Sequence, residues 1–91
     1  MTTIVDETIN VIAIFESPPR SGDSQPSHAA MRPVKFRWRG RLYPVEEITY
    51  RWQSTEGRST ILHFSVSDGR ALYELTCNKD SLKWRLGSIE A

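Results

Sequence analysis

Apolar and polar residues alternate along most of the chain from residue 34 onward, as in β-strands that bury one face. Phe36 and Trp38 lie on one side of this pattern, and Gly40 interrupts it. A two-residue turn at Arg39-Gly40 or at Gly40-Arg41 returns the chain as a hairpin. Either turn keeps the next apolar residues on the face of Phe36 and Trp38, so the pattern leaves the choice between them open.

The spacing of apolar residues slips by one position at Glu46-Glu47. Val45 and Ile48 are three positions apart instead of two. An extra residue of this kind is typical of a β-bulge, which bends a strand and lets a small sheet curl. Beyond the predicted bulge, Ile48, Tyr50 and Trp52 alternate again and are expected to face the core.

Three turns are predicted to join the remaining strands. They are a three-residue loop at 55–57 with Gly57 in the left-handed position, the Asp68-Gly69 pair, and a four-residue loop at 78–81. These turns align one apolar face in three rows: Trp52-Thr60-Cys77-Leu82, Tyr50-Leu62-Leu75-Trp84 and Ile48-Phe64-Tyr73-Leu86. The agreement between turn chemistry and alternation predicts an all-β meander of five strands. With one N-terminal strand, it is expected to curl into a small open, SH3-like barrel.

The first third of the chain combines one strand with a segment rich in turn residues. Thr8–Phe15 is rich in β-branched residues and too short for a stable helix, so it is predicted to be a strand. Both of its faces are apolar, so we expect it to be covered on both sides or to pair with another chain. Residues 16–32 are rich in Ser and Pro and are predicted to be a mobile linker. Strand and linker (1–33) and barrel (34–91) are expected to form a single domain.

Length and composition narrow the class of protein. The chain has 91 residues, enough for one domain with a small core, and its single cysteine excludes an intrachain disulfide. The longest apolar run, 11–15, is far too short to span a bilayer, and the N-terminus lacks the pattern of a signal peptide. We therefore expect a cytoplasmic protein with no membrane partner, cofactor, metal or small-molecule substrate.

Charge is distributed unevenly along the chain. Residues 1–31 carry one basic side chain against four acidic ones, whereas residues 32–58 carry seven basic against three acidic. A local positive field attracts polyanions even when the net charge, here +1, is small. The alternative is an internal match, in which the acidic segment lies against the basic one.

Catalytic chemistry finds little support in the sequence, which contains no P-loop, nucleophile elbow, zinc-binding helix motif or dinucleotide fingerprint. Cys77 falls on the apolar face and is predicted to be a core residue. His63, Glu74 and Arg85 are predicted to lie in one row on the outer face, which is typical of surface charge pairs. In such a row, replacing Glu74 by Gln should lower the pKa of His63. We therefore expect the protein not to be an enzyme.

Four short stretches of the chain form a recognisable pattern: FRWRGRLYPV at residues 36–45, Trp52, YEL at 73–75 and WRL at 84–86. Together they resemble a family of small bacterial β domains of unknown function. It covers about residues 34 to 89, together with the strand 9–15. Domains of this family occur alone or attached to the Y-family DNA-polymerase-like proteins of bacterial damage tolerance. The resemblance therefore implies a nucleic-acid setting, and it brings no catalytic residues with it.

The basic residues of the first predicted hairpin suggest a binding surface. In a strand, Lys35, Arg37 and Arg39 point the same way at intervals of about 7 Å, which is close to a phosphate spacing. With Arg41 and Arg51 they could contact the backbone of DNA or RNA. The leading hypothesis is thus a non-catalytic nucleic-acid-binding module. The alternative is a protein-interaction module in which residues 8–15 pair with a partner protein or a second copy of the chain.

Overall fold

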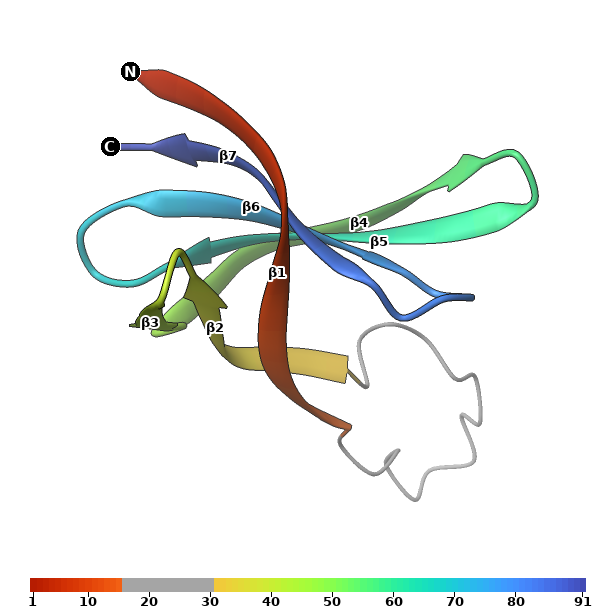
Figure 1. Ribbon diagram of the computed structural model, residues 1–91, viewed down its shortest axis with the longest axis horizontal. Coiled ribbons are helices and arrows are strands. Elements are labelled where there is room, and N and C mark those ends of the chain that lie inside the picture. Colours follow the sequence, from red (N-terminus) through yellow and green to blue (C-terminus); the bar gives the residue numbers. More distant parts are fainter. Residues whose placement is uncertain (16–30) are drawn as a thin grey trace.

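Seven antiparallel strands form one sheet in the computed structural model, which describes residues 1–15 and 31–91 (Figure 1). The strands are β1 (Thr2–Phe15), β2 (Met31–Trp38), β3 (Arg41–Pro44), β4 (Glu47–Glu56), β5 (Ser59–Ser67), β6 (Leu72–Asn78) and β7 (Trp84–Glu90). Their order in the sheet is β3-β2-β1-β7-β6-β5-β4, and the sheet is not closed. The all-β class is confirmed. The predicted open, SH3-like barrel of five to six strands is not matched exactly, because the single open sheet has seven strands.

Strand β1 is longer than predicted and joins the two halves of the sheet. Residues 2–9 pair with β7, and residues 10–15 pair with β2. Ile9, Val11 and Ala13 face the core, and the strand begins six residues earlier than predicted, at Thr2. The sequence pattern does not reveal this early start, because the N-terminal half of β1 is polar and only one of its faces is covered. The predicted linker, residues 16–32, lies outside the described residues except for the first two residues of β2.

The β2–β3 hairpin turns at Arg39-Gly40, which settles the choice that the sequence left open. Trp38 pairs with Arg41, and Phe36 pairs with Tyr43. Both turn residues have positive φ, 52° at Arg39 and 76° at Gly40, as a type I′ turn requires.

The chain changes partners where the bulge was predicted. The Val45 N–H donates to the Val34 carbonyl at 2.9 Å, whereas the Glu46 N–H donates to the Ser67 carbonyl at 2.8 Å. The predicted bulge at Glu46-Glu47 is therefore a crossing from β2 to β5, and the β-bulge itself lies further on, between Ile48 and Tyr50. A crossing and a bulge both shift the apolar spacing by one, so the sequence pattern does not distinguish them.

The β4–β5 turn also differs from its prediction, and the difference reverses a face. Glu56 pairs with Ser59, so the turn is the two residues Gly57-Arg58 and not a three-residue loop. The partners of Tyr50 and Trp52 on β5 therefore lie an odd number of positions from the predicted ones. An odd shift places a side chain on the opposite face of the sheet. Tyr50 is 65% exposed, so the prediction that it lies in the core is wrong.

The two remaining registers shift by two residues and keep their faces. Phe64 pairs with Leu75, and Leu75 pairs with Leu86, where Tyr73 and Trp84 were expected. An even shift leaves the same side chains inside. The predicted core residues Leu62, Phe64, Leu75, Cys77 and Leu86 are accordingly all buried. Leu82 is the exception: it lies in the β6–β7 loop and is 61% exposed.

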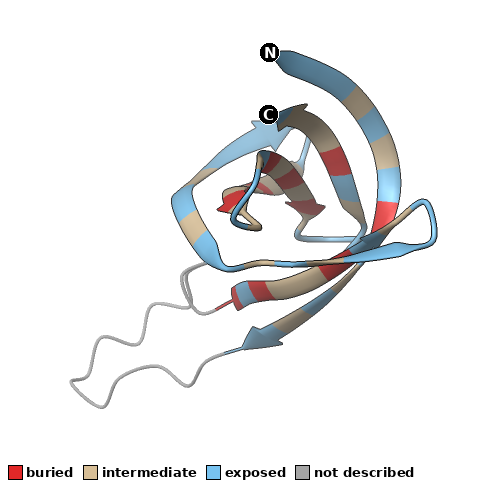
Figure 2. Ribbon diagram, turned by 90° about the vertical axis from the view of Figure 1, so that its left-hand side faces the viewer, coloured by how far each residue is buried: buried red, intermediate tan, exposed pale blue. Residues whose placement is uncertain are grey.

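The sheet curls so that β2 and β3 approach the inner face of the other strands (Figure 2). The rings of Phe36 and Tyr73 meet edge to face at 5.2 Å, and Tyr43 stacks on Phe36 at 5.2 Å. We use inner face for the side that carries these rings and outer face for the opposite side. In the part of the chain that the structure describes, no helix has the length and apolar character needed to cross a membrane.

Candidate functional site

Two of the five predicted binding residues share the outer face of β2. Lys35 and Arg37 flank Phe36, whose side chain is buried on the inner face. Arg37 lies between Asn10 of β1 and Leu42 of β3. Within residues 1–15 and 31–91, neither Lys35 nor Arg37 makes an ion pair, so both charges are available to a ligand.

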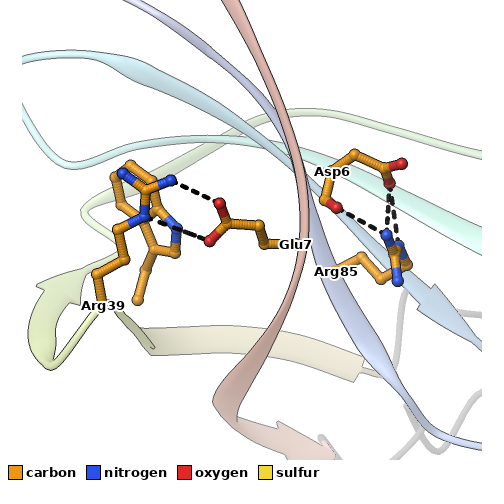
Figure 3. A network of polar contacts seen from close by, with 5 residues as sticks. Asp6, Glu7, Arg39 and Arg85 are labelled. Carbon is orange, nitrogen blue, oxygen red and sulfur yellow. Dashed lines mark hydrogen bonds and ion pairs between the residues drawn. The ribbon is translucent and has the colours of Figure 1, made fainter.

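Arg39 leaves this surface because its backbone turns. Its guanidinium lies 4.7 Å from the ring centroid of Trp38 and pairs with the Glu7 carboxylate at 2.6 Å. Glu7 also accepts a hydrogen bond from Trp38 Nε1 at 2.9 Å. These contacts, with the Arg39 hydrogen bond the largest cause, hold the pKa of Glu7 below its usual value. Figure 3 shows Glu7 and Arg39 on one side of β1 and Asp6 and Arg85 on the other.

Arg41 and Arg51 also lie apart from the outer face of β2. Arg41 pairs with Trp38 and therefore belongs to the opposite face of the hairpin. Arg51 pairs with Phe64 and points to the inner side of β4. The structure thus brings Lys35 and Arg37 together and places the other three predicted residues elsewhere.

Two cations that the sequence reasoning did not select extend the surface. Arg85 is paired in register with Thr8 on the outer face of β1, and Lys83 lines the same groove as Arg85. Thr8 and Asn10 are neighbours on that face, so Arg37 and Arg85 flank β1 with Cα atoms about 12 Å apart by standard strand spacings. The alternation in WRL at 84–86 was the available signal. We call Lys35, Arg37, Lys83 and Arg85 the outer cation group.

Arg85 is the member of the outer cation group that is partly neutralised. Its guanidinium donates to Asp6 Oδ1 at 2.7 and 3.1 Å and to the Asp6 carbonyl at 2.8 Å. Asp6 can reach it because a register shift between Ile4 and Glu7 places Asp6 at φ 53°. The Glu7–Arg39 contact is a partial case of the internal charge match that the sequence suggested, whereas the partner of Asp6, Arg85, lies outside the basic segment 32–58.

A shallow groove of about 350 Å³ runs across the outer face of β4–β7. Its lining includes both cations Lys83 and Arg85, both acids Asp6 and Glu56, and the polar side chains of Ser54, His63, Thr76 and Asn78. A second groove of about 220 Å³ lies beside β2 and includes Lys35, Arg37 and Asn10. The outer cation group therefore lines two neighbouring grooves.

His63 lies at the β4 end of the larger groove. Its ring stacks on Trp52 at 4.8 Å with an interplanar angle of 13°, and its Nε2 is 2.7 Å from Ser54 Oγ. Burial lowers the pKa of His63, and the nearby Glu74 carboxylate opposes that shift. The predicted row is wrong, because Arg85 pairs with Thr76 and Glu74 pairs with Ser88.

Ser54, His63 and Glu74 follow one another in space as a nucleophile, a base and an orienting acid would, but no hydrogen bond joins His63 to Glu74. Glu74 Oε1 is 4.0 Å from His63 Nδ1, and that nitrogen is buried without a hydrogen-bond partner in the described chain. A base that orients a nucleophile needs its second ring nitrogen held by a hydrogen bond. The arrangement supports a polar contact surface better than a catalytic one.

Cys77 is buried in the core, as predicted. Burial raises the pKa of its thiol, which keeps the thiol protonated and unreactive at neutral pH. Across the described ranges 1–15 and 31–91, no three His, Cys, Asp or Glu side chains gather into a potential metal site.

One of three comparisons with known proteins finds a match. No curated protein and no solved structure matches the chain. A family model described as a domain of unknown function, DUF6504, matches residues 1–89. Since this match spans almost the whole chain, the protein belongs to that family of domains of unknown function.

Proposed function

We propose that this protein is a non-catalytic module that binds the phosphate backbone of nucleic acid through the outer cation group. The observation that carries the proposal is the placement of four cations on the outer face to either side of β1: Lys35 and Arg37 on β2, Arg85 on β7 and Lys83 just before β7. Among the described residues, Asp6 is the acidic side chain that pairs with this group, and its partner is Arg85.

The spacing of the outer cation group suits a chain of phosphates better than a single anion. Lys35 and Arg37 are about 7 Å apart along β2, and Arg85 lies about 12 Å from Arg37 across β1. Cations at these spacings can contact several successive phosphates of one strand. Contacts to phosphate position a protein without reading sequence, so the affinity should depend little on base sequence.

The resemblance to domains attached to Y-family DNA-polymerase-like proteins of bacteria supports the same class of ligand. In that setting a small accessory domain meets DNA at high local concentration, so weak contacts suffice. Nothing in this role requires a catalytic residue.

The test measures salt-dependent binding to a short DNA duplex by fluorescence anisotropy. Four phosphate contacts predict that log K falls against log salt with a slope of about −3 to −4. The double variant Lys35→Glu plus Arg37→Glu should lower the affinity and reduce the steepness of that slope by about 2.

The matched control is Arg58→Glu plus Arg70→Glu, which makes the same change in net charge at two exposed turn residues. The control should bind nearly as well as the natural chain. Equal losses in both double variants, or binding that salt does not weaken, would refute backbone contact by the outer cation group.

A second candidate function is strand pairing with another copy of the chain, and the edge of β1 favours it. Strand β7 pairs with β1 only as far as Ile9, and no described strand pairs with that side of residues 10–15. Ile12 and Ile14 on this stretch are 52% and 40% exposed. An open edge beside exposed isoleucines is the usual requirement for strand addition.

Sedimentation equilibrium decides this second candidate. It predicts a dimer that Ile12→Arg plus Ile14→Arg dissociates, whereas Ile4→Arg, at an exposed position of β1 that pairs with β7, leaves the dimer intact. A monomer at every concentration tested would exclude self-pairing.

A further inference from the structure

We propose that Tyr50 and Trp52 form a stacking platform for unpaired bases, so that the preferred ligand of this module is single-stranded. The inference rests on the proposed function and extends it. It concerns the outer face of β4, which no predicted binding residue occupies.

Three rings follow one another across β4 and β5. The Tyr50 and Trp52 centroids are 5.3 Å apart, and Trp52 stacks on His63 at 4.8 Å. Tyr50 has its ring mostly in solvent, and Ser65, its partner in register, is too small to cover it. One side of this series of rings is therefore open to a further planar group.

The core does not need these two aromatic residues. On the opposite face of the same hairpin, Phe64 and Leu62 are already fully enclosed. The bulge between Ile48 and Tyr50 and the Gly57-Arg58 turn are what direct Tyr50 and Trp52 outward. Exposed aromatic rings on a sheet face are the means by which proteins stack bases without reading their sequence.

Lys83 and Arg85 of the outer cation group lie within reach of the platform. Ser54 and His63, next to Trp52, line the same groove as Lys83 and Arg85. Pairings Trp52–His63, His63–Thr76 and Thr76–Arg85 put three strand spacings, about 14 Å, between Trp52 and Arg85. A strand whose bases stack on the rings can therefore place neighbouring phosphates over these cations.

Glu56 and Asp6 also line this groove. Asp6 is held by Arg85, and Glu56 lies at the far end of β4 beside the turn. A duplex keeps its bases paired and stacked inside the helix, so it can reach the cations but not the rings. This difference gives the proposal its test.

The experiment compares a short oligothymidylate with a mixed-sequence DNA duplex of equal length, again by anisotropy. The oligothymidylate should bind more tightly. Tyr50→Ala should weaken its binding by about fivefold to a hundredfold, the range expected for one stacked base, and should leave duplex binding unchanged. Tyr50→Phe, which keeps the ring, should restore most of the affinity.

The control is Leu72→Ala, which removes an exposed apolar side chain from the outer side of β6 without touching a ring. It should not change either affinity. The amide NMR spectrum of each variant confirms that the sheet is intact.

The outcomes separate the two proposals. If Lys35→Glu plus Arg37→Glu weakens both ligands and Tyr50→Ala weakens neither, the platform is refuted while backbone binding stands. If Tyr50→Ala weakens the single strand but the charge reversals have no effect, backbone contact by Lys35 and Arg37 is refuted while the platform stands. If neither DNA binds at low salt, both are refuted.

Discussion

The role of a single residue in this protein depends on which neighbouring strand its side chain meets. Asp6 and Glu7 are adjacent in sequence, yet one reaches Arg85 on the outer face and the other reaches Arg39 and Trp38 on the inner side. His63 is enclosed between Trp52 and its neighbours on β6, so its imidazole is partly removed from water. Its protonation is therefore linked to folding.

Stability should decrease as pH falls below about 6.5 because of His63. Its pKa is lowered in the folded chain, so the unfolded chain binds more protons in this range. The loss begins near the unfolded value, 6.5, and ends at the lower folded pKa. Urea unfolding at a series of pH values should show this loss in the natural chain and a smaller one in His63→Gln.

Glu74→Gln provides a second check on the same residue. Because the Glu74 carboxylate is the group that raises the pKa of His63 against the effect of burial, its removal should lower that pKa further. An NMR titration of the His63 ring measures this pKa, and a higher pKa in the variant would contradict the assignment.

Glu7 titrates separately: its stabilising contacts persist above pH 4.5 and are lost as pH falls through its lowered pKa.

The strands show which parts of the fold a sequence pattern can predict. Alternation identified Phe64, Leu75 and Leu86 as core residues even though their registers were wrong, because a shift of two keeps the face. It failed at Tyr50 and Trp52, because the two-residue turn shifts their register by three, and the bulge restores an even shift only at Ile48. Thr49 is the extra residue of that bulge, and its residue type does not distinguish it from an ordinary strand residue.

The candidate site was predictable only in its local part. Lys35 and Arg37 could be assigned to one face because both lie within one strand. Arg39 left that face through a turn whose register the sequence did not fix. Arg85 meets Asp6 across 79 positions, a pairing that depends on β1 lying beside β7 and that no local pattern encodes.

The β4–β5 hairpin depends on the conformation of Gly57. Its φ is +62°, and an added Cβ would meet no atom within 4 Å, so only the backbone opposes a larger residue. Gly57→Ala should therefore cost about 1–2 kcal/mol of unfolding free energy, measured by urea titration. Gly57→Asn should cost less, because asparagine tolerates the left-handed region.

Gly87→Ala is the control for this prediction. Gly87 is not in the left-handed region, and its added Cβ would lie at an ordinary 3.5 Å from the Glu74 carbonyl. The substitution should change stability by less than about 0.5 kcal/mol. Similar costs at Gly57 and Gly87 would show that the turn conformation is not what holds the hairpin.

The whole molecule depends on β1, which connects its two sets of strands. Figure 1 shows β1 crossing between the β2–β3 hairpin and the β4–β7 meander. These two parts share hydrogen bonds through β1 and, at one corner, through Val45 and Glu46. Ile9, in the middle of β1, is buried in the common core.

A fragment of residues 31–91 should therefore fail to fold cooperatively. It retains every β4–β7 pairing but loses the strand between β2 and β7 and exposes Met31 and Phe36 of the core. Circular dichroism during urea unfolding should show no sharp transition. A separate peptide of residues 1–15 should restore one, whereas the same peptide with Ile9→Asp should not. A cooperative transition in the fragment alone would contradict a central role for β1.

The pairing of β1 with β7 also sets the order of events in time. Thr2 pairs with Glu90, whereas the hairpins between β4 and β7 pair residues close in sequence. Hairpins form within microseconds, but a contact between distant residues must first close a long loop, which is slow. We therefore expect the β4–β7 meander to form first and β1 to pair with β7 afterwards. Until β1 arrives, the β7 edge and the isoleucines of β1 are exposed together, and this interval is when the chain is most prone to aggregate.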